Sequence, residues 1–384
     1  MKNKIGQKIF LLLFSLGLTF FVLEIIVRAI DKSPHQDIYT RDPNTSLLIL
    51  KPEQEFVVKQ ECFENKIISN SFGFNSREYD IKKPDDVFRI VIVGDSFVES
   101  NQIPLANTFF TKLEEKLNSQ EDKQYKYEII PFGISSHGTY LNLIYLKEYA
   151  MQYQPDLIID AFLVANDVTD DFVKLNPSDQ FDQNGNIILS LPELPEPNFK
   201  TKIKSTIKNI FKKSALIMFS YEKYLAQQSS SIIAEDDVEL DKQVFLSEYS
   251  QEWQQAWDNQ EKFLAEFQNI AIANNIDFLL LSLTEAYRVH DNLFDELDEK
   301  YKNQEIFDYN KPETILQEIA DEHKFSYLAL YPAFKKRAQN TTESTVWSCD
   351  GHWNELGHDW ASDIIYGYLT DNIHLINREY SDRI

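Results

Sequence analysis

FRIVIVGDSF at residues 88–97 is the stretch that decides the fold of this 384-residue chain. It joins six mostly apolar, β-forming residues to a Gly-Asp-Ser turn, which predicts a buried parallel strand followed by a sharp bend. Gly94 permits that bend and leaves Ser96 at the carboxyl end of the strand, the edge where open α/β sheets bind ligands. A serine there can lose its proton to a base while its backbone N–H faces a developing oxyanion. For this stretch alone, an ordinary strand-to-loop turn is an equally good interpretation.

Strand-like and helix-like segments alternate along much of the chain, which predicts right-handed crossovers, an α/β fold and a parallel sheet. The further predicted strands are residues 126–131, 155–163, 276–283 and 325–330. The predicted helices are residues 108–117, 140–149, 253–274, 314–323 and 360–369. The turns after the first three strands converge on one rim, so Ser96, the loop 133–138 and Asn166 are expected to lie together.

The first thirty residues predict a membrane anchor. Three lysines precede an uncharged run from Ile9 to Leu23, and Glu24 and Arg28 follow it. The end of this apolar segment is rich in bulky Ile and Val, which favours an uncleaved helix over a cleaved signal peptide. Lysines on the amino side predict a cytoplasmic N-terminus, with the remaining chain outside the cytoplasm. Residues 31–60 contain spaced prolines and are expected to be irregular, and residues 31–69 are expected to form a stalk or an extended wrap onto the domain.

Residues 171–250 interrupt the alternation and predict a helical insertion. Its segment 199–226 combines an apolar stripe with lysines crowded at the start. A contact with a membrane surface or an anionic polymer is one interpretation. A helix packed on the domain with solvated lysines is favoured, because charge runs are usually solvated.

The composition of the chain limits the classes of partner and cofactor that it can bind. The net charge of −23 argues against nucleic acid, which needs a basic face. Cys62 and Cys349 are too few for a disulfide scaffold or a zinc site, and either one disulfide or two buried thiols is open. No phosphate-binding glycine loop and no flavin or nicotinamide fingerprint is present, so we expect no cofactor.

A second chemical segment lies near the C-terminus, at residues 348–358. His352 is the side chain best suited to accept a serine proton near neutral pH, and Asp350 can fix its tautomer and stabilise the imidazolium. The alternative is a polar helix start capped by Asn354. A metal site made of Asp350, His352 and His358 is less favoured, because no further strong ligand segment is visible.

The combination of motifs resembles the SGNH/GDSL hydrolase superfamily. The residues that carry the resemblance are Gly94-Asp95-Ser96-Phe97, the loop 133–138, Ala165-Asn166-Asp167 and Asp350-Gly351-His352-Trp353-Asn354. The resemblance spans roughly residues 70–370 of a domain expected at residues 70–375, with the insertion outside the common pattern. It implies a flavodoxin-like three-layer α/β/α sandwich.

By this resemblance, Ser96 is the nucleophile, His352 the general base and Asp350 the residue that orients the histidine. The oxyanion donors are then the backbone N–H of Ser96, the side chain of Asn166 and an N–H of the 133–138 loop. Ser136 stands in that loop where the family usually has glycine, and its Cβ is expected to narrow the acyl pocket.

The family usually places the acid three residues before the histidine, whereas Asp350 stands two before His352. That spacing, with Trp and Asn after the histidine, resembles membrane-associated SGNH-like proteins of exopolysaccharide O-acetylation. The resemblance implies a serine esterase that hydrolyses O-acyl, above all O-acetyl, esters of carbohydrate or cell-envelope substrates. An O-acetyltransferase and a non-catalytic polymer-binding module are the alternatives.

Overall fold

The computed structural model describes residues 2–30, 38–121, 124–173, 180–191, 214–217, 220, 240–290 and 307–377. The chain divides into two units, Met1–Asp37 with Leu194–Val238 and Ile38–Glu193 with Glu239–Ile384. Each unit is described by itself. The domain boundaries expected from the sequence stay predictions. The basic segment 199–226 lies almost entirely outside the described residues.

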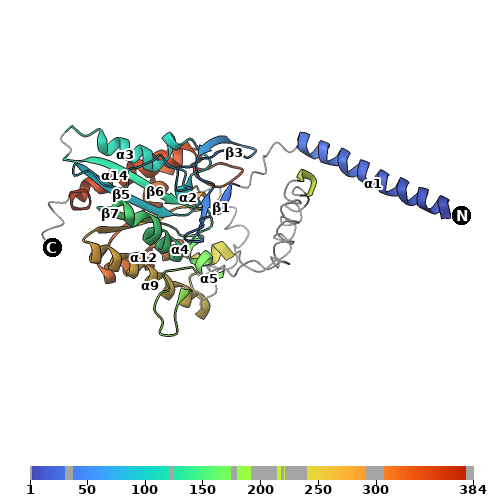
Figure 1. Cartoon of the computed structure of the whole chain (residues 1–384). Coiled ribbons are helices and arrows are strands. Elements are labelled where there is room, and N and C mark those ends of the chain that lie inside the picture. Colours follow the sequence, from blue (N-terminus) through green and yellow to red (C-terminus); the bar gives the residue numbers. More distant parts are fainter. Residues whose placement is uncertain are drawn as a thin grey trace. The chain divides into compact units, whose positions relative to one another are not determined.

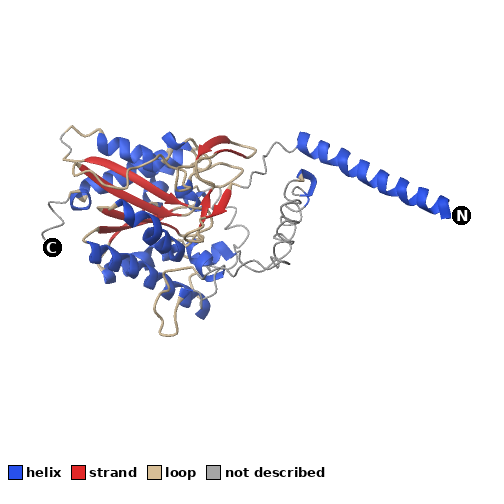
Figure 2. Ribbon diagram, viewed as in Figure 1, coloured by secondary structure: helices blue, strands red, loops and turns tan. Residues whose placement is uncertain are grey.

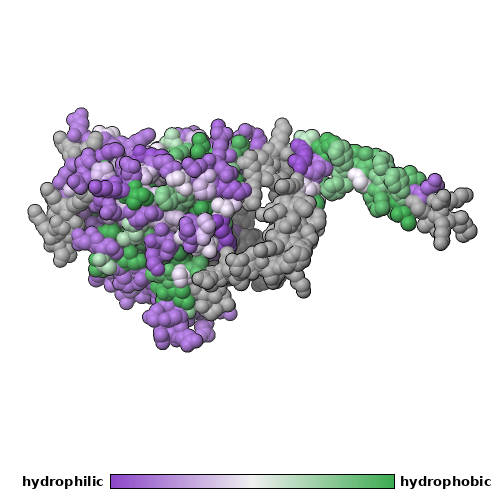
Figure 3. All heavy atoms as spheres, in the orientation of Figure 1, coloured by the Kyte–Doolittle hydropathy of each residue, from purple (hydrophilic) through white to green (hydrophobic). Residues whose placement is uncertain are grey.

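The first unit contains one long apolar helix, α1 (Lys2–Ile30). Its stretch Gln7–Ala29 has a mean hydropathy of 2.6 and is long enough to cross a membrane, as a signal sequence also can be (Figure 3). Glu24 and Arg28 form an ion pair at 2.7 Å one turn apart. Glu24 also accepts hydrogen bonds from Ser214 Oγ at 2.7 Å and Ala215 N at 2.9 Å.

The second unit is built on a five-stranded parallel sheet with the order β6-β5-β7-β8-β9. Its strands are β5 (Val87–Gly94), β6 (Lys126–Gly133), β7 (Leu157–Leu163), β8 (Asp277–Leu283) and β9 (Ser326–Ala329). In chain order this is 2-1-3-4-5, the flavodoxin-like arrangement. The predicted α/β class and parallel sheet are confirmed.

Helices cover both faces of the sheet (Figures 1 and 2). Ile90 and Ile92 of β5 pack towards one layer, and Val91 and Val93 towards the other, because successive side chains alternate across a strand. The first layer is α3 (Phe109–Asn118), α13 (Tyr331–Ala338) and α14 (Glu355–Asp371). The opposite layer is α4 (Thr139–Tyr145), α9 (Gln251–Asn274) and α12 (Lys311–His323).

Shorter helices follow three of the strands at their carboxyl ends. These are α2 (Ser96–Glu99) after β5, α5 (Asp167–Val173) after β7 and α10 (Ala286–Val289) after β8. A π-turn (Leu146–Ala150) and a 3-10 turn (Met151–Tyr153) extend α4. The carboxyl edge of the sheet is therefore where the candidate residues gather.

The segment from residue 38 to residue 69 contains strands, although residues 31–60 were expected to be irregular because of their prolines. It forms two antiparallel pairs, β1 (Tyr39–Arg41) with β2 (Leu48–Leu50), and β3 (Glu55–Lys59) with β4 (Glu64–Ile68). The expectation was wrong because prolines also belong in turns between strands, and Pro43 and Pro52 lie there.

Candidate active site

Ser96 is the first residue of α2, directly after β5. Asp95 caps this helix, and its Oδ1 accepts a hydrogen bond from Phe97 N at 2.9 Å. A Cβ at Gly94 would lie 2.5 Å from Val98 Cγ2, so the tight strand-to-helix turn requires glycine. The buried strand and the capped helix together fix the position of the serine.

His352 lies on the loop before α14 and contacts Ser96 at the carboxyl edge of the sheet. Its Nε2 lies 2.7 Å from Ser96 Oγ, and its Nδ1 bonds to Asp350 Oδ1. Asp350 Oδ1 also accepts a hydrogen bond from the backbone N of His352 at 3.3 Å. The structure therefore brings the three residues singled out in the sequence into one hydrogen-bonded chain.

The two-residue spacing between Asp350 and His352 works because of the residue between them. Gly351 has φ +85°, a left-handed conformation that glycine adopts without strain. Gly351 N donates to Trp347 O at 2.8 Å, and Trp347 N donates to His352 O at 2.9 Å. This closed turn brings the Asp350 carboxylate into contact with the His352 imidazole.

The ionisation of this pair is shifted in opposite directions. Burial opposes the charge on Asp350, but the hydrogen bond and charge of His352 outweigh it and lower the carboxyl pKa. Burial also opposes the charge on His352, but Asp350, with help from Asp95 and Glu99, raises the imidazole pKa. A histidine with a raised pKa is a stronger proton acceptor.

Asn166 lies beside the serine turn and contacts it through Asp95. Its Nδ2 donates to Asp95 Oδ2 at 3.1 Å. Burial raises the pKa of the fully buried Asp95 to about 6, against opposing hydrogen bonds from Phe97 and Asn166. An amide NH2 carries two protons, so Asn166 keeps a second donor in addition to this contact.

Ser136 is exposed and has φ +64°, the left-handed region that favours glycine. This conformation agrees with its position as a stand-in for the usual glycine. Within the described parts of the chain, the backbone N–H groups of Ser96 and Ser136 donate no hydrogen bond to another residue. Both amides are therefore free to donate to a ligand.

Glu99 was not recognised from the sequence, although it shapes the same rim. It is 1% exposed, and its Oε2 accepts hydrogen bonds from Ser135 N at 3.1 Å, from Ser135 Oγ and from Tyr39 OH at 2.9 Å. Burial raises the Glu99 pKa. The sequence signal for Glu99 was its position as a charged residue one turn after Ser96. No pattern near Glu99 in the sequence indicated its contact with Tyr39.

The segment after β8 is a second support that the sequence did not reveal. Glu285 Oε1 accepts a hydrogen bond from Ala165 N at 2.8 Å, next to Asn166. Trp353 Nε1 donates to Thr284 O at 3.2 Å, next to His352. Thr284 and Glu285, which are adjacent in sequence, thus hold the base of the histidine loop and the Asn166 turn, respectively.

Several carboxyl groups are buried behind the serine turn. They are Asp95, Asp160, Asp167, Asp170 and Asp171. Burial raises the pKa of Asp160 and Asp167 well above the usual range, and raises that of Asp171 to about 7. Desolvation disfavours the charged carboxylate of Asp160, Asp167 and Asp171.

The alternative metal site is not assembled. His358 is buried, and its Nδ1 accepts a hydrogen bond from Phe109 N at 3.1 Å, while Asp350 and His352 bond to each other. Burial lowers the pKa of His358 to about 3. His358 therefore belongs to the packing between α3 and α14.

Comparison with family models finds no match, and comparison with curated proteins finds none either. Solved structures do match. The acetyl xylan esterase AlAXEase is 14% identical, with 73% of this chain and 100% of that chain covered and a TM-score of 0.40. LAE5, an alpha/beta hydrolase enzyme from the metagenome of Lake Arreo, is 12% identical over 75% and 96% of the two chains, with a TM-score of 0.41. The lipase/acylhydrolase from Enterococcus faecalis is 12% identical over 74% and 96%, with a TM-score of 0.38.

These proteins are named as esterases, hydrolases and acylhydrolases, the classes to which the SGNH/GDSL resemblance of the sequence points. Because the identities are 14% or less and the TM-scores 0.41 or less, we base the assignment of function on the geometry of the site.

Proposed function

We propose that this protein is a serine esterase of the SGNH/GDSL type that cleaves O-acyl esters through an acyl-enzyme on Ser96. The observation that carries the proposal is the hydrogen-bonded chain from Ser96 Oγ to His352 Nε2 at 2.7 Å, and from His352 Nδ1 to Asp350. Nucleophile, base and orienting acid are the parts that acyl transfer by serine requires.

In the first step, Ser96 Oγ attacks the ester carbonyl and His352 Nε2 takes the serine proton. Asp350 stabilises the imidazolium that forms. The N–H groups of Ser96 and Ser136, with the Asn166 side chain, donate to the oxyanion of the tetrahedral intermediate. His352 then gives its proton to the leaving alcohol, and water attacks the acyl-enzyme by the same route.

The acyl group that fits this proposal is small. By the SGNH/GDSL resemblance, Ser136 stands where the family usually has glycine, and its Cβ would narrow the acyl pocket. Acetyl esters of carbohydrate or envelope polymer are therefore the substrates we favour. We further propose that α1 anchors the chain, with its lysine-bearing end in the cytoplasm and the catalytic unit outside it.

The test is release of acetate from acetylated oligosaccharides and of p-nitrophenol from p-nitrophenyl acetate by the full chain in detergent. Ser96→Ala and His352→Ala serve as matched variants, and hydrolysis should be lost in both. Consumption of p-nitrophenyl acetate only with a sugar acceptor would instead indicate O-acetyl transfer. No turnover by a folded wild-type chain would favour a polymer-binding module.

A further inference from the structure

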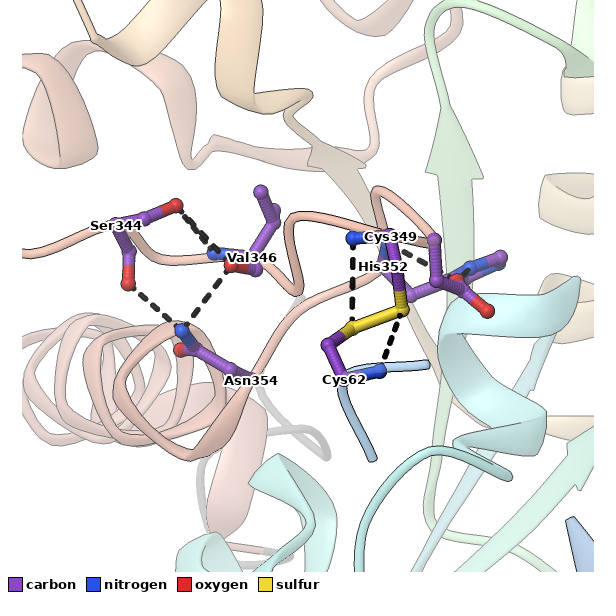
Figure 4. The surroundings of a disulfide bond; sticks show 7 residues. Cys62, Ser344, Val346, Cys349, His352 and Asn354 are labelled. Carbon is purple, nitrogen blue, oxygen red and sulfur yellow. Dashed lines mark hydrogen bonds and ion pairs between the residues drawn. A yellow bond between two sulfur atoms is a disulfide. The ribbon is translucent and has the colours of Figure 1, made fainter. Parts of the chain in front are cut away.

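Cys62 and Cys349 form a disulfide that joins two parts of the chain 287 residues apart. Cys62 lies in the turn of the β3–β4 hairpin, and Cys349 directly precedes Asp350. Figure 4 shows the bond between the two cysteines. The backbone N of Cys62 donates to Cys349 Sγ at 3.2 Å, and the backbone N of Cys349 donates to Cys62 Sγ at 3.4 Å. The crosslink therefore ends one residue from the acid of the site.

The turn that carries Asp350 and His352 is tied to the rest of the fold through side chains: His352 contacts Ser96 and the ring of Phe97, and Trp353 bonds to Thr284 O. In the described residues, the backbone hydrogen bonds of Trp347, Asp350 and Gly351 all stay within this turn. Cys349 is exposed at its tip. Apart from the disulfide, the hairpin holds the turn through the ring of Phe63, which lies 5.6 Å from the ring of Trp347.

The other end of the crosslink is firmly placed. β3 and β4 pair in register from Glu55–Ile68 to Lys59–Glu64. Asn65 of β4 is buried, and its Nδ2 donates to Asn101 O at 3.0 Å and Ile103 O at 2.5 Å. Residues 101–103 come just after α2, the helix that begins with Ser96. The hairpin thus connects the serine side of the site with the histidine side.

We propose that the Cys62–Cys349 disulfide is a positioning crosslink that holds Asp350 and His352 in register with Ser96, so that full esterase activity requires the oxidised chain. This inference rests on the proposed function. Two-electron reduction by a soluble dithiol converts the disulfide into two thiols, and the dithiol becomes a disulfide. Cys349 is exposed to such a reagent, and an oxidising compartment outside the cytoplasm would form the bond.

The experiment measures hydrolysis of p-nitrophenyl acetate by the full chain when oxidised, after treatment with dithiothreitol, and after reoxidation. Reduction should lower kcat roughly tenfold to a hundredfold, the scale expected for a small misplacement of catalytic groups, and leave KM nearly unchanged. Reoxidation should restore kcat. Cys62→Ser and Cys349→Ser should each match the reduced wild type, and dithiothreitol should not slow either variant further, because the chain has no other cysteine.

The pH profile separates positioning from general loss of stability. Asp350 raises the pKa of His352, so releasing the turn should move the acid limb of the kcat/KM profile to lower pH. Loss of folded protein alone would lower activity without moving this limb. A reduced chain with unchanged kcat and an unchanged acid limb would overturn the inference while the esterase proposal stands.

Failure of the proposed function is recognised separately. If the oxidised wild type hydrolysed no ester, the function would fail, and the crosslink would be tested by the imidazole pKa of His352, measured by NMR with His352→Gln for assignment. A lower His352 pKa on reduction would support positioning of Asp350 by the disulfide. An unchanged value would contradict it.

Discussion

The two sides of the site are held in different ways. Ser96 follows a strand that is buried along its whole length, and Asp95 caps the helix that the serine begins. His352 lies on a turn whose backbone bonds are internal, beside a disulfide to Cys62. Local sequence positions the nucleophile, whereas contacts with a distant part of the chain position the base. Substitutions at the serine should therefore remove the chemistry, while substitutions around the histidine should misalign it.

Ser96→Ala should cause the largest loss of activity. With no nucleophile, kcat for p-nitrophenyl acetate should fall by about 10⁶, as expected when a serine nucleophile is removed. Labelling by a fluorophosphonate should disappear as well. The thermal unfolding temperature should stay close to wild type, because the side chain is small and half-buried. Retained labelling would place the nucleophile elsewhere.

Asp350→Asn tests the histidine side. The amide cannot stabilise the imidazolium, so kcat should fall by about 10³ to 10⁴. The pKa of His352 should also fall, and since the neutral imidazole is the active form, the acid limb of kcat/KM should move to lower pH. Glu343→Gln, an exposed change in the same loop, is the matched control. An acid limb at the same pH in Asp350→Asn would contradict the assigned role.

Asn166→Ala removes the side-chain donor to the oxyanion. We expect kcat to fall by about 10² to 10³ with KM changed little, because the hydrogen bond strengthens in the transition state. Steady-state kinetics with p-nitrophenyl acetate measure both constants. A rise in KM at constant kcat would instead show that Asn166 only binds substrate.

Glu99→Gln tests whether the Glu99 carboxyl positions the loop that carries Ser136. A neutral amide accepts less strongly from Ser135 and Tyr39, so the loop should be less well placed and kcat should fall roughly tenfold. Tyr39→Phe removes one of these hydrogen bonds and should have the smaller effect. Equal activity of Glu99→Gln and wild type would show that this carboxyl does not position the loop.

Asp171→Asn should change stability more than activity. Folding raises the Asp171 pKa to about 7, from about 3.9 in the unfolded chain, because the carboxyl is buried. Above pH 4 the unfolded state therefore binds fewer protons, and wild-type stability falls as the pH rises towards 7. This loss is about 4 kcal/mol at most.

Replacement by Asn keeps an oxygen that can accept from Tyr140 N and Gln260, and it removes the charge. Urea unfolding at pH 5 and pH 8 should show a smaller decrease in this variant than in wild type. Glu318→Gln, an exposed change on α12, should behave as wild type. The same decrease in Asp171→Asn would mean that Asp171 ionises without cost.

Sequence patterns predicted the parts of the fold that depend on local periodicity. The strand before Ser96 reads as a continuous apolar run, and the helices show apolar faces at helical spacing. Asp350 and His352 were also found, because acid and base stand two residues apart. The irregular structure expected for residues 31–60 was wrong where β1, β2 and β3 form, since a proline signals a turn without saying what lies on either side.

The supports of the site could not be found in this way. Glu99 and Tyr39 are 60 residues apart, and Cys62 and Cys349 are 287 apart. Their pairing follows from how strands and loops meet in space, which no local pattern encodes. The two cysteines left a disulfide and free thiols equally open until the hairpin was placed beside the histidine turn.

The central claim is that Ser96 carries the acyl group. It is tested most directly by quenching the full chain in acid shortly after mixing with p-nitrophenyl acetate, then locating the acetyl group by peptide mass spectrometry. We predict acetylation of the peptide that contains Ser96, and none there in Ser96→Ala. Ester turnover with no acetyl group on Ser96, or with the same acetylation pattern in Ser96→Ala, would contradict the claim.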